Sequence, residues 1–208
     1  MLSLKVPTLD ISQGDRLSRD AYRADFRDRV WDNDGRDSWK LERQQYFQEP
    51  GSDSWKAFSQ GDWEGALRLI EQRRDGLLQY MSEAEKRNFS LYRVRVVEEP
   101  IVPYLQWELY LLRLRAECGE RIRVVGPEHI RGFEENGPLP ELVSLGGRTM
   151  YKVIYDSRGI SDGALRFVDP EILGRWEEFI KGLYERGEDM SSYFERKVAL
   201  LPPPTPAE

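Results

Sequence analysis

The sequence has 208 residues, of which 33% are charged, and a formal net charge of −6 at pH 7. This length allows one domain with a sizeable core, and the negative charge argues against non-specific binding to nucleic acid or anionic membranes. A single cysteine, Cys118, excludes an intrachain disulfide and favours a cytoplasmic protein. We expect no signal peptide and no membrane span, because no window approaches the roughly 20 apolar residues that a span requires.

Residues 1–38 are predicted to form an N-terminal arm with one charged helix. Apolar residues recur near one face between Asp15 and Trp31, and arginines alternate with aspartates between them. The run Asp32-Asn33-Asp34-Gly35 then predicts a turn. The mixed charges are typical of a solvated helix, and partner binding is the function that we expect for it.

Residues 39–197 are predicted to form a single domain that begins with short segments. Residues 39–47 fit either a strand or a helix, and residues 52–60 fit a short helix. A longer helix is expected over residues 62–89, with a weak point at Gly76.

A strand–helix–strand unit is predicted at the centre of the domain. Residues 91–97 and 121–125 are rich in β-branched residues, and an apolar helix over residues 103–118 separates them. Strands joined by a helical crossover are parallel, and the crossover is right-handed.

The rest of the domain is predicted to contain irregular chain, a hairpin and two helices. The expected elements are helical turns at 127–131 and 140–145, antiparallel strands at 150–156 and 164–169, a helix at 170–184, and a short helix around Tyr193. The fold class is therefore α/β, with α+β as the alternative, built on a small mixed sheet. Residues 198–208 are rich in proline and are predicted to be a disordered tail.

One carboxylate of the central helix lies on an unexpected side. At 100° per residue, Glu108 falls nearly opposite the polar face, one turn after Tyr104. An unpaired buried carboxylate is costly, so we expect Glu108 to meet Arg93 or Arg95 of the adjoining strand, or Arg43. Two interpretations remain open: a buried network that attaches helix to sheet, or a polar pocket for ligand binding or acid–base chemistry.

The candidate pocket comprises Arg43, Arg93, Arg95, Glu99, Tyr104, Glu108 and Asp156. Its mouth is expected at the carboxyl ends of the parallel strands, near Glu99. The single histidine, His129, excludes a site with two histidine ligands, and the sequence has no glycine-rich phosphate loop. Acids are too abundant for their grouping to indicate a metal site, so we expect neither a metal nor another cofactor.

Short motifs across residues 39–195 resemble a known family. They are Leu41-Glu42-Arg43 with Tyr46, Trp55 and Phe58 before Gly61, Arg93-Val94-Arg95-Val96-Val97, Glu99-Pro100, Tyr104 with Glu108, Gly119-Glu120, Ile122-Arg123, Tyr155-Asp156 and Phe167-Val168-Asp169. They resemble the DUF6879 proteins of actinobacteria, a family of unassigned function. Genes of this family often lie beside helix-turn-helix regulators and small partner proteins, so the resemblance implies a regulatory or effector role. It supplies no catalytic residues.

We therefore expect a non-enzymatic intracellular regulator that acts through a protein partner, such as a helix-turn-helix regulator, without binding nucleic acid or membranes itself. The alternative is a hydrolase or nuclease-like enzyme, or a ligand-binding domain, that uses the polar pocket. Convergence of the candidate side chains in one open pocket would favour the alternative, and their dispersal among ion pairs would disfavour it.

Overall fold

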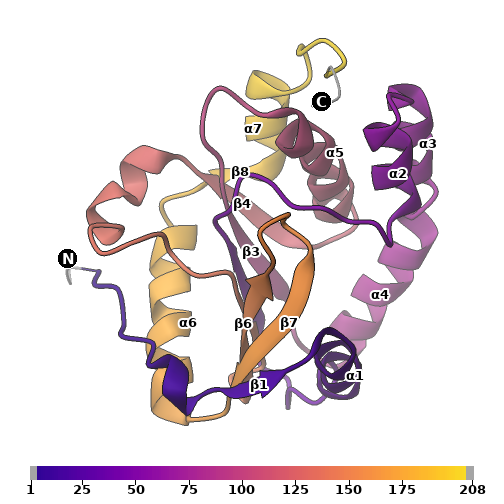
Figure 1. The fold of residues 1–208 in the computed structure, drawn as a ribbon. Coiled ribbons are helices and arrows are strands. Elements are labelled where there is room, and N and C mark those ends of the chain that lie inside the picture. The colour runs from indigo at the N-terminus through magenta and orange to yellow at the C-terminus, as the bar shows by residue number, and fades with distance from the viewer. Residues whose placement is uncertain (1–3, 205–208) are drawn as a thin grey trace.

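The computed structural model describes residues 4–204, which form an α/β fold around an eight-stranded mixed sheet (Figure 1). The strand order is β1-β7-β6-β5-β2-β3-β4-β8. The strands are β1 (Asp15–Leu17), β2 (Ser38–Glu42), β3 (Leu91–Val96), β4 (Arg121–Val125), β5 (Leu142–Leu145), β6 (Thr149–Tyr155), β7 (Ser161–Phe167) and β8 (Glu188–Asp189). The neighbours β2, β3 and β4 are parallel, and the other pairs are antiparallel.

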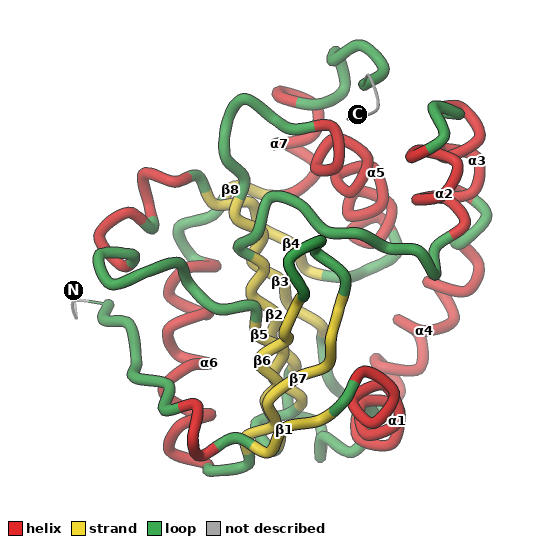
Figure 2. The backbone as a smooth tube through the Cα atoms, in the orientation of Figure 1, coloured by secondary structure: helices red, strands yellow, loops and turns green. Residues whose placement is uncertain are grey.

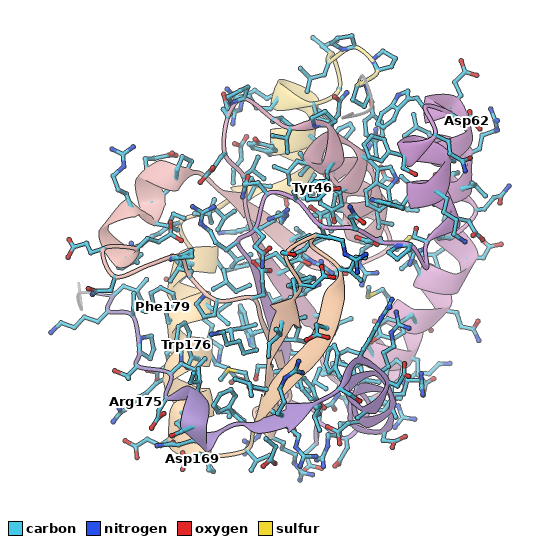
Figure 3. The ribbon with its side chains drawn as sticks, viewed as in Figure 1. Tyr46, Asp62, Asp169, Arg175, Trp176 and Phe179 are labelled. Atoms are coloured by element: carbon cyan, nitrogen blue, oxygen red, sulfur yellow. The ribbon has the colours of Figure 1, made fainter. Side chains whose placement is uncertain are left out.

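The helices cover both faces of this sheet (Figures 1 and 2). They are α1 (Arg19–Arg29), α2 (Asp53–Ser59), α3 (Trp63–Glu71), α4 (Arg74–Lys86), α5 (Pro103–Glu117), α6 (Pro170–Tyr184) and α7 (Met190–Lys197), with short 3-10 turns at Ile11–Gln13, Pro127–His129 and Arg131–Phe133. Several begin at a side-chain N-cap, as α3 does at Asp62 and α6 at Asp169 (Figure 3). Among residues 4–204, none of the helices combines the length and apolarity needed to cross a bilayer.

The predicted strand–helix–strand unit is confirmed as β3, α5 and β4, with β3 and β4 parallel. Alternation along β3 sorts its side chains onto two faces. Val94 and Val96 pack into the core under α6, whereas Arg93 and Arg95 lie on the face that α5 covers. One face of the central sheet is therefore apolar and the other carries charges.

Helix α6 closes the apolar face. Its buried residues Leu173, Trp176, Ile180 and Leu183 recur with the spacing of one helical face, and Phe179 lies beside them (Figure 3). Burial of a large apolar side chain stabilises a fold by roughly 1.5–3 kcal/mol. This layer is therefore the main apolar core under the centre of the sheet.

The structure differs from the prediction at two elements. Residues 140–145, predicted as a helical turn, contain β5, which pairs with β2 and β6. The predicted helix over residues 62–89 is divided into α3 and α4 around Gln72 and Arg73, and Gly76 lies within α4 rather than at the break. The segment that was open to either interpretation, residues 39–47, contributes strand β2.

The segments outside the predicted domain also pack against it. Strand β1 pairs with β7, and Asp25 of α1 accepts hydrogen bonds from Tyr151 at 2.7 Å and Arg166 at 3.0 Å. At the other end, Val198 is fully buried and Gln106 donates to the carbonyl of Pro202 at 2.9 Å. The chain thus continues as packed structure to about Pro202, instead of becoming disordered at residue 198. Residues 205–208 of the predicted tail lie outside the described residues.

Substitution Gly163→Ala tests the pairing of β1 with β7. Gly163 has φ +116°, and a Cβ atom there would lie 2.1 Å from the carbonyl oxygen of Leu17. We expect this substitution to lower the free energy of unfolding by at least about 1–3 kcal/mol, measured by chemical denaturation. The matched control is Gly174→Ala in α6, where a Cβ meets open space and helix propensity should raise stability by up to about 1 kcal/mol. Equal effects of the two changes would contradict the close approach of β1.

Candidate functional site

A buried ion pair joins α5 to β3. The Arg95 side chain is 0% exposed, the Glu108 side chain is 6% exposed, and Arg95 Nη2 lies 2.7 Å from Glu108 Oε2. Arg95 Nε donates to the same oxygen at 2.9 Å, and Nη1 donates to the backbone carbonyls of Glu42 and Val96. Glu108 therefore meets one of the arginines that its position on the helix predicted.

A second set of ion pairs lies beside the first. Arg93 Nη1 donates to Glu42 Oε2 at 2.6 Å, and Arg93 Nε donates to Glu120 Oε1 at 2.7 Å. Glu120 also pairs with Arg115 of α5, and Glu42 with Lys40 of β2. We call Glu42, Arg93, Arg95, Glu108, Arg115 and Glu120 the buried network. Sequence reasoning did not select Glu42, Arg115 or Glu120 for the site, although the first and last lie in the motifs shared with the family.

The carboxylates of the buried network differ in their protonation equilibria. Burial alone would raise the pKa of Glu42, but the charges of Arg93 and Lys40 outweigh it and lower the pKa. Burial also raises the pKa of Glu108, and the charge of Arg95 offsets only part of that effect. Glu42 is therefore firmly ionised, while Glu108 depends on its arginine for its charge.

Three of the predicted pocket residues lie in ion pairs of their own. Arg43 contacts both Glu98 and Glu134 at 2.7 Å, Glu99 contacts Lys197 at 2.9 Å, and Asp156 contacts Arg158 at 2.9 Å within the β6–β7 turn. The other four, Arg93, Arg95, Tyr104 and Glu108, lie in or beside the buried network, and Tyr104 donates to Glu49 at 2.9 Å. Residues 4–204 contain no group of three or more His, Cys, Asp or Glu positioned to hold a metal ion.

A cleft of about 630 Å³ opens above part of the buried network. Glu42 and Glu108 contribute to its lining, together with residues of α1, of the segment between α3 and α4, and of the loop that joins β2 to α2. Figure 2 shows this loop crossing from the sheet to α2, and Gln48 within it bridges to Ile160 of the β6–β7 turn. Segments far apart in the sequence therefore enclose the cleft.

Three arginines line this cleft without a direct ion pair, although the charge of Glu49 acts on one of them, Arg73. Arg19 and Arg23 come from α1, and Arg73 precedes α4. Within residues 4–204 none of them forms an ion pair, and the buried Nε of Arg19 has no hydrogen-bond acceptor. We call Arg19, Arg23 and Arg73 the rim arginines. The sequence did not predict them, because alternating arginines and aspartates in α1 are typical of a solvated helix. The spacing of four residues between Arg19 and Arg23, which places both on one side of the helix, was the signal available.

The acidic groups at the cleft do not neutralise the rim arginines. Glu42 and Glu108 already contact Arg93 and Arg95, and Asp53 contacts Lys56. Burial raises the pKa of Glu49, which also accepts a hydrogen bond from Tyr104. The rim arginines therefore form a local group of positive charges in a chain whose net charge is −6. Such a site attracts small anions.

Substitution Glu108→Ala should destabilise the protein strongly. It leaves the guanidinium of Arg95 buried without its counter-charge, for which we expect a loss of about 3–5 kcal/mol in the free energy of unfolding. Urea denaturation provides the measurement. The control is Glu64→Ala, which removes an exposed pair with Arg68 and should cost less than about 1 kcal/mol. A loss at Glu108 no larger than that of the control would contradict the buried pairing.

Substitution Glu141→Gln should change how stability depends on pH. Burial, followed by the charge of Glu42, raises the pKa of Glu141 from 4.5 to about 7, while its Oε1 accepts hydrogen bonds from the backbone N–H groups of Arg43 and Gln44. Between these pH values the folded state binds more protons than the unfolded state, so this group lowers stability as pH rises. Glutamine keeps the acceptor and removes the charge.

We therefore expect the stability of the Glu141→Gln variant, relative to the unsubstituted protein, to increase between pH 4.5 and pH 7, by at most about 3 kcal/mol. Denaturant titrations of both proteins across this range measure the difference. A difference that does not vary with pH would refute a raised pKa for Glu141.

Comparison with known proteins places the chain in a family. The family model described as "Domain of unknown function (DUF6879)" matches residues 24–195, from within α1 to within α7. Neither the curated proteins nor the solved structures contain a significant match. The matched region includes the whole buried network and Arg73, whereas Arg19 and Arg23 precede it. Because the match covers most of the 208 residues, the chain belongs to the DUF6879 family.

Proposed function

We propose that this protein is a non-enzymatic regulatory protein that binds a small anionic ligand in its cleft and acts through a protein partner. The observation that carries the proposal is the set of rim arginines, which form no ion pair among the described residues. The carboxylates of Glu42 and Glu108 beside them are already paired. The sequence resemblance to proteins encoded beside helix-turn-helix regulators supports a partner of that kind.

The chemistry of the rim arginines favours an oxyanion. A guanidinium presents several N–H donors in one plane, so two or three of them together match the oxygens of a phosphate or a similar group. The cleft volume of about 630 Å³ lies within the range of small-molecule sites. The volume and the donors therefore fit a small molecule with at least one negatively charged group.

Binding fits the geometry better than catalysis. The six side chains that an enzyme would need, Arg43, Arg93, Arg95, Tyr104, Glu108 and Asp156, do not converge in one open pocket. Arg93, Arg95 and Glu108 are held in ion pairs, so they have little freedom to exchange protons or to approach a substrate. The hydrolase alternative would therefore require most of these contacts to break.

We further propose that the protein acts in the cytoplasm, as an actinobacterial regulator without direct affinity for nucleic acid. Support comes from its composition, since a net charge of −6 repels the phosphate backbone of DNA outside the cleft. Any effect on transcription would then pass through the partner. A ligand in the cleft would act by favouring one arrangement of α1 and of the segment that leads into α4, because both contribute to the cleft and also expose surface to a partner.

Binding of inorganic pyrophosphate tests the proposal. We expect pyrophosphate to raise the melting temperature with increasing concentration, and to bind less tightly as salt increases. Arg23→Ala should weaken binding roughly tenfold, because it removes a charge-assisted hydrogen-bond donor. Calorimetric titration measures the dissociation constant.

The matched control is Arg27→Ala, one turn further along α1 and outside the cleft lining. It should bind pyrophosphate as the unsubstituted protein does. Equal weakening in both variants would indicate a general charge effect, and the absence of any binding at millimolar pyrophosphate would overturn the proposal.

A further inference from the structure

A second cavity of about 670 Å³ adjoins the first. The two share Lys40, Gln72 and Arg73 in their linings, so they are neighbours, and α1 lines both of them. In Figure 1 the helices α1 and α4 lie on the same side of the sheet, opposite α6. The second cavity thus lies beside the rim arginines, one of which, Arg73, lines both cavities.

The lining of the second cavity is mainly apolar and aromatic, and it also includes Arg93, Arg115 and Glu120 of the buried network. Tyr22 and Phe26 come from α1, Leu77 and Tyr80 from α4, and Leu145 from β5. Tyr22, Phe26 and Tyr80 are only partly buried, so they are not sealed within the core. Aromatic rings at such a surface bind planar ring systems by edge and face contacts.

Helix α1 contributes side chains to both cavities. Arg19 and Arg23 reach the first cavity, and Tyr22 and Phe26, each three residues further along, reach the second. Residues three and four apart lie on the same side of a helix. One side of α1 therefore presents two neighbouring rows of side chains, Arg19 with Arg23 at the first cavity and Tyr22 with Phe26 at the second.

Extending the proposed function, on which this step rests, we infer that the ligand is an aromatic phosphate: its phosphate contacts the rim arginines, and its ring system occupies the cavity between α1 and α4. A purely inorganic anion would leave the aromatic cavity unused. A neutral aromatic molecule would leave the rim arginines without a counter-charge. The two neighbouring cavities, of about 630 and 670 Å³, provide the volume for both groups of one molecule.

A substitution at Gly76 can fill the second cavity without affecting the first. Gly76 lies in α4, lines the second cavity, and has nothing within 4 Å of the position of a Cβ atom. Gly76→Leu adds side-chain volume to the cavity without removing an existing contact, and leucine has the higher helix propensity. Gly174→Leu in α6, also in open space but away from the cavity, is the matched control.

The test is calorimetric titration with three probes: 1-naphthyl phosphate, inorganic phosphate and 1-naphthol. We expect 1-naphthyl phosphate to bind at least tenfold more tightly than either other probe. Gly76→Leu should weaken 1-naphthyl phosphate about tenfold and leave inorganic phosphate unchanged, whereas Arg23→Ala should weaken both phosphates. Gly174→Leu should change none of these affinities.

The outcomes separate this inference from the proposed function. If inorganic phosphate binds through Arg23 but 1-naphthyl phosphate gains nothing, or Gly76→Leu has no effect on it, the aromatic inference is overturned and anion binding stands. If neither phosphate binds, both are overturned, whether or not 1-naphthol binds. Thermal melting of each variant verifies that it is folded before titration.

Discussion

The structure depends on the pairing of Arg95 with Glu108, two charges placed where almost no water reaches them. Removing either partner would leave the other charge buried alone, at a cost of several kcal/mol. Helix α5 can therefore dock on β3 only in the register that brings these groups together. The neighbouring contacts of Arg93 with Glu42 and Glu120 extend the same constraint to β2 and to the end of α5.

This constraint explains why the two faces of the sheet differ. The face under α6 is apolar and buried. The opposite face carries the buried network, and α5 can cover it because Glu108 and Arg115 of that helix supply counter-charges. Helices α1 and α4 instead stand over β2 and β5 with a cleft between them and the sheet. The paired charges form its floor, and unpaired arginines stand at its edge.

The sequence allowed prediction of the parts that local patterns determine. The β-branched runs and the apolar helix predicted the parallel unit, and the helical position of Glu108 predicted a buried pairing with an arginine of β3. Strands β1 and β8 have only three and two residues, too short for alternation to reveal them. The candidate site was only partly predictable: Arg43 finds its partners in Glu98 and Glu134 across the fold, and the rim arginines converge only through tertiary packing.

The most direct test of this account is the double substitution Arg95→Met with Glu108→Leu, measured for both stability and pyrophosphate affinity. If the pair is structural, replacing both charges by apolar groups should recover most of the stability that Glu108→Ala loses. Pyrophosphate should then still bind at the rim arginines with an unchanged dissociation constant. A folded double variant that no longer binds pyrophosphate would contradict the account, because it would make the buried pair part of the binding site.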